Sequence, residues 1–297
     1  MKWKMKSLVR ALSTLFLLGL PFLAQAAARV EPLRVTVSIP PQRYFVQQIG
    51  GGLVEVSVMA APGANPHVFE PRPQQMVALS KSRIYFAIGV TFERAWLKKF
   101  AGVNPEMMIV PTDEGIEKLP MAQDHPESEK GHDHGNKDPH VWLSPPLVMI
   151  QARNVLDALV RMDPSRRTRY EENYRVFMRD LVDLDLKIRA VFSGKERGLK
   201  FMVYHPSWGY FAKSYGLKQI PIEMEGKEPR PRQLEELIQR GRKEGVKVVF
   251  VQPQFSSKSA NTIAQALKGQ VMYADPLASN WAENLLEVAE KFREALR

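Results

Sequence analysis

Eight short apolar segments, in two groups of four, constrain the fold of this 297-residue chain more than any other feature. Most of them are near-continuous apolar runs, which is what a sheet buried on both faces requires. Segments with helical periodicity separate many of them. The first group comprises Leu33–Ile39, Val54–Ala60, Arg83–Gly89 and Met107–Thr112, and the second comprises Leu199–His205, Leu217–Ile222, Val246–Gln252 and Gln270–Asp275. The pattern predicts an α/β fold of two lobes with mainly parallel sheets.

The longest helical pattern lies between the two groups. Asp163-Pro164 is typical of a helix start, and Ser193-Gly194 is typical of a helix end. Apolar residues recur between them at steps of three and four: Tyr170, Tyr174, Phe177, Leu181, Leu184, Ile188 and Val191. A helix of about 28 residues measures roughly 40 Å. We therefore interpret residues 163–194 as one long rigid helix that links the lobes; the alternative is a core helix of one lobe.

The linking helix divides the remaining chain into an N-terminal lobe, residues 27–162, and a C-terminal lobe, residues 195–297. The C-terminal lobe ends in an amphipathic pattern that carries Trp281, Leu285, Val288 and Phe292. Such spacing predicts a helix with one apolar face. We expect this final helix to pack on the C-terminal lobe.

The first 26 residues have the layout of a secretory signal peptide. Lys2, Lys4, Lys6 and Arg10 precede an apolar run, and small residues up to Ala28 follow it. The run is shorter than the roughly 20 residues that span a membrane, so a membrane anchor is the weaker interpretation. We predict cleavage after Ala26 and export to the periplasm. The chain has no cysteine at the cleavage site to carry a lipid.

Composition excludes several classes of site. The chain contains no cysteine, so disulfides, thiolate zinc sites, iron–sulfur clusters and cysteine nucleophiles are ruled out. Lys and Arg number 42 against 32 Asp and Glu, and residues 1–26 hold four of these basic residues. The remaining excess is spread along the chain, which argues against a nucleic-acid partner. No later apolar run approaches membrane-spanning length.

Three of the six histidines lie in one polar segment, Met121–Lys137. His125, His132 and His134 occur there among four acidic residues and almost no apolar ones. Such a segment cannot bury apolar surface, so we predict a mobile loop. Its histidines indicate an accessory site that captures metal weakly and exchangeably; the alternative is a surface insertion without a role.

The other three histidines are far apart in the sequence but share a position relative to the predicted strands. His205 ends one strand, and His67 and His140 follow two others through loops. Asp275 ends a further strand. Because ligand sites of open α/β sheets lie beyond the carboxyl ends of the strands, we expect these four residues to converge in the cleft between the lobes. Three imidazoles and one carboxylate form a shell suited to zinc.

Several short motifs then match a known family. They are Ser38-Ile39-Pro40, Asn65-Pro66-His67, Asp138-Pro139-His140-Val141-Trp142, His205-Pro206-Ser207-Trp208-Gly209-Tyr210-Phe211, Glu225-Gly226-Lys227-Glu228-Pro229 and Asp275-Pro276-Leu277. In this order they resemble the zinc/manganese-type (ZnuA/TroA-like) periplasmic solute-binding proteins of bacterial metal ABC importers. The resemblance covers essentially the whole chain after the signal peptide. It implies two α/β lobes joined by a long helix, with His67, His140, His205 and Asp275 as metal ligands.

The resemblance also bears on which metal is bound. A histidine at the position of His205 and a His-rich loop before Asp138 are habits of zinc members, whereas many manganese members carry glutamate at the third position. Some zinc members have glutamate just before the first histidine, where this chain has Pro66. Imidazole-rich shells favour zinc over manganese. We therefore expect zinc, with manganese as the alternative, and an affinity that falls between about pH 6.5 and 5 as protons compete for free imidazoles.

The expected function is that of a receptor which passes zinc to an importer permease and its cytoplasmic ATPase. We expect a monomer without enzymatic activity. The alternatives are a metal-binding adhesin, or a metal-buffering protein, on the same fold. A zinc hydrolase is less consistent with the sequence, because no His-Glu-x-x-His motif occurs and four ligands can close the shell.

Overall fold

The computed structural model describes residues 31–121, 137–194, 198–223 and 227–296. The predicted signal peptide, residues 1–26, lies outside the described residues. So do His125, His132 and His134 of the predicted loop. The lobe and linker boundaries proposed above stay predictions.

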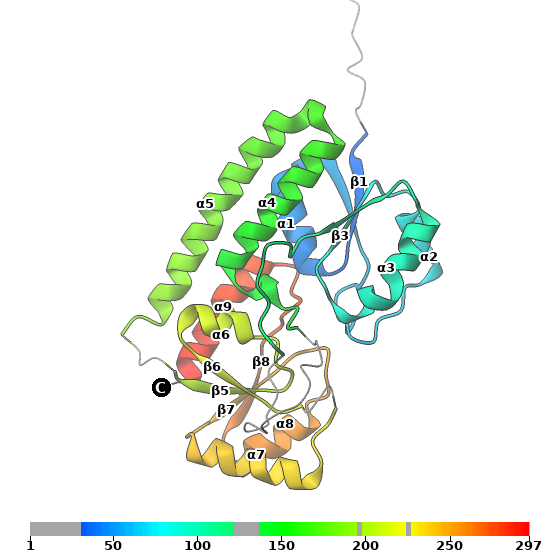
Figure 1. Ribbon diagram of the computed structural model, residues 1–297. Helices are drawn as coiled ribbons and strands as arrows, with labels where there is room; N and C mark the ends of the chain where they lie inside the picture. Colours follow the sequence, from blue (N-terminus) through cyan, green and yellow to red (C-terminus); the bar gives the residue numbers. More distant parts are fainter. Residues whose placement is uncertain (1–30, 122–136, 195–197, 224–226, 297) are drawn as a thin grey trace, which may run out of the picture. The chain divides into compact units, whose positions relative to one another are not determined.

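Two four-stranded sheets, both entirely parallel, form the framework (Figure 1). The first contains β1 (Leu33–Val37), β2 (Val54–Val58), β3 (Ile84–Ala87) and β4 (Met108–Pro111). The second contains β5 (Lys200–Val203), β6 (Lys218–Pro221), β7 (Val248–Val251) and β8 (Gln270–Tyr273). Their strand orders, β2-β1-β3-β4 and β6-β5-β7-β8, are equivalent. All eight strands lie within the predicted apolar segments, which confirms the two-sheet α/β fold.

Helices connect and cover the strands. In the first lobe these are α1 (Pro40–Gly50), α2 (Pro73–Leu79) and α3 (Thr91–Val103), and in the second they are α6 (Gly209–Tyr215), α7 (Pro231–Lys243), α8 (Lys258–Ala266) and α9 (Trp281–Ala295). Short 3-10 turns, Gly51–Leu53, Val141–Leu143 and Pro164–Arg166, complete the path. The central strands β3 and β7 are buried throughout, and β1 is buried from Val35 to Val37. Val35 pairs with Val56 on one side and with Ile84 on the other. Among the described helices, none is long and apolar enough to cross a membrane.

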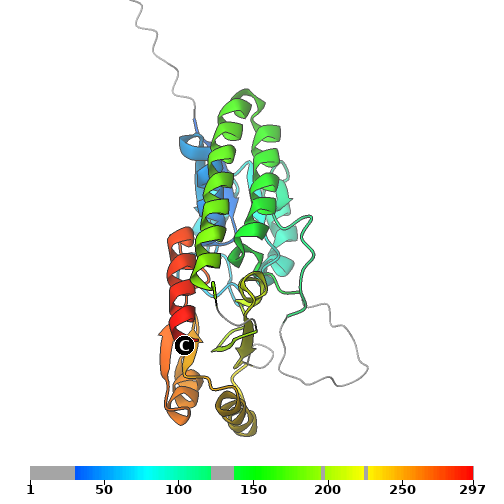
Figure 2. The same cartoon turned by 90° about the vertical axis from the view of Figure 1, so that its left-hand side faces the viewer.

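The long helix is α5 (Arg167–Val191), which follows α4 (Pro145–Met162) after the 3-10 turn at Pro164. Figures 1 and 2 show α4 and α5 side by side, and the two helices contact each other along their lengths. The buried face of α5 consists of Tyr170, Phe177, Leu181, Leu184 and Ile188. These residues follow the predicted spacing of three and four, so the long linking helix is confirmed.

The final helix differs from the expectation. Phe292 of α9 does pack in the second lobe, with its ring 4.3 Å from that of Phe201 and 4.4 Å from that of Phe250. Trp281, at the other end of α9, packs against the first lobe instead: its ring lies 4.9 Å from that of Phe45 on α1. The expectation that α9 packs on the C-terminal lobe therefore holds at Phe292 but not at Trp281, because the apolar face of α9 is long enough to contact both lobes.

Both sheets reverse their winding direction between two adjacent strands, β1 and β3 in the first and β5 and β7 in the second. Loops after such strands form a crevice at the carboxyl edge of the sheet. In the second lobe that crevice is bordered by His205, two residues after β5, and by the loop that follows β7. The fold thus positions His205 where an open α/β sheet binds ligands.

Candidate metal centre

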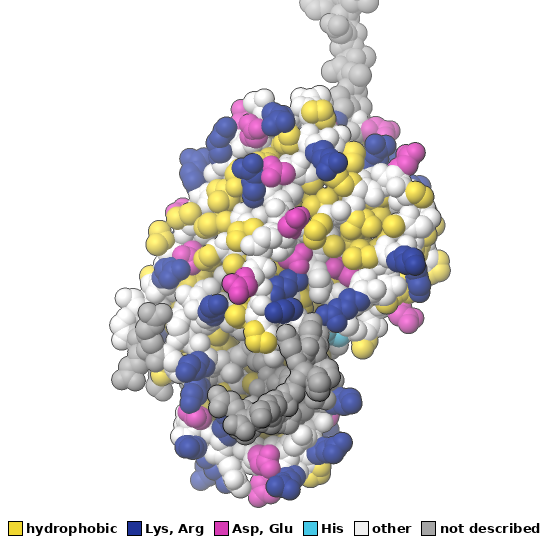
Figure 3. Space-filling model, viewed as in Figure 1, with side chains coloured by type: hydrophobic (Ala, Val, Ile, Leu, Met, Phe, Trp, Pro, Cys, Tyr) yellow, Lys and Arg dark blue, Asp and Glu magenta, His cyan; other side chains and the backbone are white. Residues whose placement is uncertain are grey.

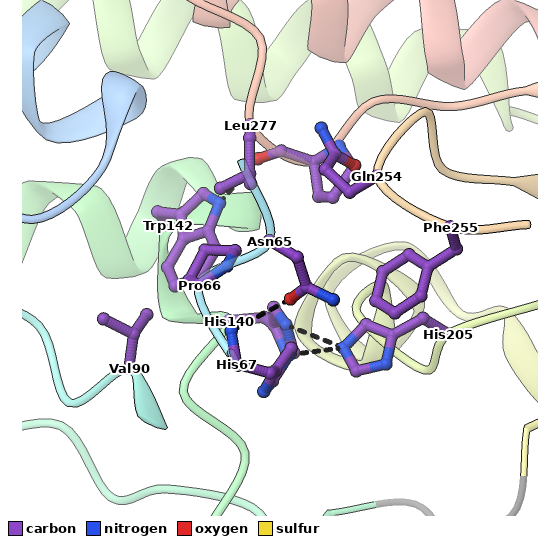
Figure 4. A pocket seen from close by; sticks show the side chains of 11 residues that line it. Asn65, Pro66, His67, Val90, His140, Trp142, His205, Gln254, Phe255 and Leu277 are labelled. Atoms are coloured by element: carbon purple, nitrogen blue, oxygen red, sulfur yellow. Dashed lines mark hydrogen bonds between the residues drawn. The ribbon is translucent and has the colours of Figure 1, made fainter. Parts of the chain in front are cut away.

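Three histidines from separate loops meet at one point. His67 lies in the loop after β2, His140 directly precedes the 3-10 turn Val141–Leu143, and His205 follows β5. The Nε2 atom of His205 lies 3.0 Å from Nε2 of His67 and 3.3 Å from Nε2 of His140. One ligand atom from each of the three lies within 4.8 Å of the others, and no other such group of three occurs in the described ranges. Figure 4 shows the three imidazoles facing one another.

Two carboxylates determine which imidazole nitrogens carry protons. The Nδ1 atom of His140 lies 2.7 Å from Oδ1 of Asp138, and Nδ1 of His205 lies 2.7 Å from Oε1 of Glu223. A carboxylate accepts a hydrogen bond, so each Nδ1 is the protonated nitrogen and each Nε2 carries a free lone pair. The Nδ1 atom of His67 faces the hydroxyl of Thr91 at 2.9 Å. The lone pairs of His140 and His205 therefore point at each other across 3.3 Å, an arrangement that a cation between them would stabilise.

The local sequence around these residues explains why the loops hold their shape. In Asn65-Pro66-His67 and in Asp138-Pro139-His140, the side-chain oxygen of the first residue accepts the backbone N–H of the third, at 2.9 Å in both cases. Such side-chain turns are a known preference of Asn and Asp, and the proline between them fixes one backbone angle. The two motifs therefore build the same small turn, which sets the position of each histidine.

Burial favours the neutral form of two of the three histidines. His140 and His205 are each only 4% exposed. Burial is the main reason that the pKa of His67 falls to about 2, and the neighbouring His205 and His140 lower it further. Burial likewise lowers the pKa of His205, although the hydrogen bond to Glu223 partly opposes the shift. Because metals bind neutral imidazole, His67 and His205 are already in the binding form at neutral pH.

Asp275, the fourth expected ligand, lies outside the group of three. Its Oδ1 accepts hydrogen bonds from Nε2 of Gln254 at 2.8 Å and from the backbone N–H of Leu277 at 2.9 Å. The second of these bonds is the same side-chain turn as in the two histidine motifs, here formed by Asp275-Pro276-Leu277. The structure thus brings together His67, His140 and His205, whereas Asp275 is hydrogen-bonded to Gln254 and Leu277, two residues that line the same cavity.

A small cavity of about 20 Å³ adjoins the three histidines. Trp142, Gln254, Phe255 and Leu277 are among its other lining residues, and Figure 4 shows them around the imidazoles. The ring of Phe255 stacks on His205 at 4.8 Å with an angle of 17° between the planes. Apolar walls of this kind limit access of water and strengthen the electrostatic interaction of a bound cation with nearby carboxylates.

Four residues that support this site are not predicted from the sequence. They are Asp138, which lies in the motif Asp138-Pro139-His140, and Glu223, Thr91 and Gln254. The only sequence signal for Asp138 is its position two residues before His140. Glu223 and Thr91 reach their histidines only after folding, since Glu223 is 18 residues and Thr91 is 24 residues from its partner. No local pattern would have found them.

Comparison with known proteins gives consistent results. The family described as zinc-uptake complex component A, periplasmic, matches residues 35–295. The high-affinity zinc uptake system protein ZnuA of Bacillus subtilis is 29% identical over 250 residues, which are 82% of this chain and 77% of that protein. A crystal structure of ZnuA is 41% identical with a TM-score of 0.83, covering 90% of this chain and all of the other.

A further similar structure is that of the laminin-binding protein Lmb of Streptococcus agalactiae, described as bifunctional with adhesin and metal-transporting activity. It is 23% identical with a TM-score of 0.78 and covers 90% of this chain and all of the other. At this level of identity the likeness concerns the fold.

Proposed function

Because the chain belongs to the family of periplasmic components of zinc-uptake complexes, we propose that it captures zinc in the periplasm and delivers it to the permease of an ABC importer. The convergence of three Nε2 atoms, two of them with lone pairs fixed by buried carboxylates, carries this proposal. A site whose purpose is capture needs ligands that are neutral and oriented before the metal arrives. Glu223 orients His205 in this way, and burial favours its neutral form, which supports the proposal.

The donor set favours zinc among divalent metals. Imidazole nitrogen suits zinc, whereas manganese prefers carboxylate, carbonyl and water oxygen. The outer partners also match: Asp138 and Glu223 each place a carboxylate directly behind one imidazole, as is usual for metal-binding histidines. Manganese remains the alternative cargo, and a competition titration with both ions distinguishes them.

We propose Asp275 as the fourth ligand in the loaded protein. Its Oδ1 is already oriented by Gln254 and Leu277, and none of the described residues donates a hydrogen bond to its Oδ2. Ligating carboxylates are commonly oriented in this way by hydrogen bonds to the other oxygen. The carboxylate must move towards the histidines to bind, because it lies outside their group.

Export by the cleavable N-terminal segment, a free periplasmic monomer and the absence of a membrane anchor are part of the same proposal. We further propose that the chain is not a hydrolase. The family is one of solute-binding receptors, and among the described residues that line the cavity none is a carboxylate that could serve as a general base. An adhesin role on the same fold is the second candidate, favoured only by the likeness to Lmb.

Zinc titration of the protein after removal of residues 1–26 tests the proposal. We expect one tight equivalent in competition with a chromophoric chelator, and a His205→Ala variant that loses at least about 100-fold in affinity, because an inner ligand should matter more than an outer partner. An exposed-residue variant, Glu235→Gln on α7, should bind as the parent does. Equal affinity of parent and His205→Ala would rule the site out. Deletion of the gene distinguishes import from adhesion, because loss of growth in low zinc is expected of an import receptor and not of an adhesin.

A further inference from the structure

Three acidic side chains are buried in the described part of the chain, and one of them hydrogen-bonds to no imidazole. Asp138 and Glu223 bind His140 and His205 directly. The third is Glu93, in the first turn of α3, which is only 2% exposed. Burying a carboxylate is unfavourable unless hydrogen bonds compensate for the lost water. The partners of Glu93 therefore indicate what this residue holds in place.

These partners come from the two strands between which the first sheet reverses its winding direction. Ser38 directly follows β1, and Ile88 and Gly89 directly follow β3. Oε1 of Glu93 accepts the N–H of Ile88 at 3.0 Å and the hydroxyl of Ser38. Oε2 accepts the N–H of Gly89 at 2.7 Å. Because loops after such strands form the crevice where open α/β sheets bind ligands, the carboxylate of Glu93 takes the place of a bound anion in the first lobe.

The bonds to Ile88 and Gly89 close the chain into a small loop at the start of α3. Glu93 accepts N–H groups from residues five and four positions before it, so the segment between them cannot extend. Gly89 has a φ of +85°, a left-handed conformation that glycine adopts without strain, and the chain turns there. The positions of Val90 and Thr91 therefore depend on the Glu93 carboxylate.

Residues inside this loop contact the segment that carries His67. Val90 lines the cavity, and Figure 4 shows it on the same side of the pocket as Pro66 and His67. The hydroxyl of Thr91 lies 2.9 Å from Nδ1 of His67, and the N–H of Phe92 donates to the carbonyl of Pro66 at 3.3 Å. A histidine that binds metal through Nε2 carries its proton on Nδ1, and a hydroxyl oxygen can accept that hydrogen bond. Thr91 is thus placed to fix the ring orientation of His67.

We propose that Glu93 is a positioning residue for the metal ligand His67: its carboxylate holds the segment Ile88–Thr91 in shape, and this segment presents the Thr91 hydroxyl to Nδ1 of His67. Each of the three histidines then depends on one buried carboxylate. The other two bind theirs directly, whereas His67 is reached through a loop and a hydroxyl group. A neutral partner orients the ring of His67 without a third negative charge next to it. The inference rests on the proposed function.

The protonation of Glu93 determines the pH at which the test is done. Burial raises the pKa of Glu93 to about 7, and the negative charge of Asp113 adds to the rise. The hydrogen bonds from Ser38, Ile88 and Gly89 oppose it. The carboxylate form therefore predominates at pH 8, where binding is measured.

Replacing Glu93 by glutamine tests the inference. Glu93→Gln keeps the shape of the side chain but turns one oxygen into an amide nitrogen, which cannot accept a hydrogen bond. The variant thus loses either the bond to Gly89 or the bonds to Ser38 and Ile88. We expect zinc affinity to fall by about tenfold, the lower end of the range for outer partners of metal-bound histidine. Glu106→Gln, at an exposed position after α3, is the matched control and should bind as the parent does.

Proton NMR of the Co²⁺-loaded protein separates positioning of His67 from a general structural role. Each histidine bound through Nε2 gives one exchangeable Nδ1–H signal that the paramagnetic ion shifts, and His67→Gln identifies the signal of His67 by its loss. In Glu93→Gln this signal should move, or broaden through exchange with water, while the other two keep their positions. In a Thr91→Val background the Glu93→Gln change should cost much less than about tenfold, because the hydroxyl through which it acts is gone.

Ser38→Ala is a second variant, since it removes one donor to Glu93 and leaves the loop residues unchanged. We expect a smaller loss of zinc affinity with the same selective change of the His67 signal. Urea unfolding in chelator checks that each variant folds. If Glu93→Gln does not fold, Ser38→Ala decides the test.

An unchanged zinc affinity and an unchanged His67 signal in the folded variants would overturn the inference. Equal shifts of all three imidazole signals would overturn it as well, and so would a loss of affinity that persists in full in the Thr91→Val background. Failure of the proposed function looks different: in that case the parent and Glu106→Gln would themselves lack a tight zinc equivalent.

Discussion

At the scale of single residues, the property that most affects metal capture is the proton position on each imidazole. His140 and His205 each donate a hydrogen bond from Nδ1 to a buried carboxylate. Asp138 is 1% exposed and Glu223 is 7% exposed. The carboxylates therefore hold the rings in the tautomer that leaves Nε2 free, and they raise the basicity of that nitrogen.

Removing the charge of one such carboxylate should weaken binding measurably. We expect Glu223→Gln to lower zinc affinity by about 10- to 100-fold, the range typical of outer partners of metal-bound histidine. The glutamine oxygen can still accept the Nδ1 proton, so the variant isolates the effect of charge. Competition titration measures it, and Glu235→Gln is the surface control. If Glu223→Gln binds zinc like the parent, the carboxylate does not support the ligand.

The lowered imidazole pKa values change the expected pH dependence of binding. Free histidines would let up to three protons compete with zinc below pH 6.5, so affinity would fall by up to about a thousandfold per pH unit. In the folded protein burial lowers the pKa of His67 to about 2 and lowers that of His205. These two imidazoles therefore compete less with protons for zinc than free histidines would. Affinity between pH 6.5 and 5 should fall clearly less than about a thousandfold per unit, and zinc titrations at several pH values measure the slope; a fall of about a thousandfold per unit would contradict this.

The same shifts make the metal-free protein sensitive to acid. Below the unfolded-state pKa of about 6.5, the unfolded chain binds protons at His67 and His205 that the folded chain does not. Stability is therefore fully present above pH 6.5 and decreases as pH falls, by at most about 1.4 kcal/mol per pH unit for each histidine. Urea unfolding in chelator at pH 7.5, 6.5 and 5.5 measures the slope. His67→Gln should reduce it; an unchanged slope would show that His67 is not responsible.

At the scale of elements, two indole groups connect the lobes beside the metal site. Nε1 of Trp142, next to His140, donates to the carbonyl oxygen of Pro276 at 2.7 Å, and Nε1 of Trp281 at the start of α9 donates to the carbonyl oxygen of Trp142 at 2.8 Å. Both side chains are 1% exposed. These buried bonds hold the His140 loop against the segment that follows Asp275, so the ligand-bearing loops of the two lobes are fixed relative to each other.

Loss of one indole donor should destabilise the molecule through this contact. We expect Trp281→Phe to lower the free energy of unfolding by about 1–3 kcal/mol, since it leaves the buried carbonyl of Trp142 without its donor. A loss of packing against Phe45 adds to this effect. Urea unfolding provides the measurement. Trp96→Phe, at a partly exposed site on α3, is the matched control, and equal stability losses for both variants would contradict a specific role for Trp281.

At the scale of the whole molecule, the ends of the predicted His-rich loop are joined next to the metal site. Pro120 and Lys137 form an antiparallel bridge, and the N–H of Asp138 donates to the carbonyl of Leu119 at 2.8 Å. The hydroxyl of Tyr210 on α6 accepts the N–H of Leu119 and donates to the carbonyl of Asp138, both at 2.9 Å. Tyr210 of the second lobe thus holds the two chain segments at the base of the loop together.

Deleting the loop should therefore leave the tight site intact. Replacing residues 122–136 by Asn-Gly, a pair suited to a tight turn between antiparallel partners, removes His125, His132 and His134. We expect calorimetry to show one tight zinc equivalent in the deletion variant and to show loss of the weaker ones only. Loss of the tight equivalent would mean that the loop is part of the site.

Charge on the molecular surface agrees with a receptor for a small ion. On the face shown in Figure 3, Lys and Arg side chains are interspersed with Asp and Glu and do not form a stripe. A nucleic-acid-binding face would gather basic residues. On this face the basic side chains are therefore spread among acidic ones, in agreement with their spread along the sequence.

The sequence by itself determined the elements and the identity of the converging histidines. The apolar segments predicted all eight strands, and the three-and-four spacing from Tyr170 to Ile188 predicted α5. Both predictions work because burial on one face of a helix, or on both faces of a strand, produces a pattern of apolar residues that are close together in the sequence. The carboxyl-edge rule then brought His67, His140 and His205 together. That rule gives the edge on which a side chain lies, but it does not give distances.

Only the tertiary structure decided the contacts that depend on long loops and on packing between lobes. The hydrogen bonds of Glu223 to His205 and of Gln254 to Asp275, and the packing of Trp281 on Phe45, all join residues without a local pattern between them. Whether Asp275 points at the histidines or at Gln254 depends on side-chain torsions and on competing hydrogen bonds. The whole folded environment decides between such side-chain conformations, because the free energies of the alternatives differ by about the net value of one hydrogen bond.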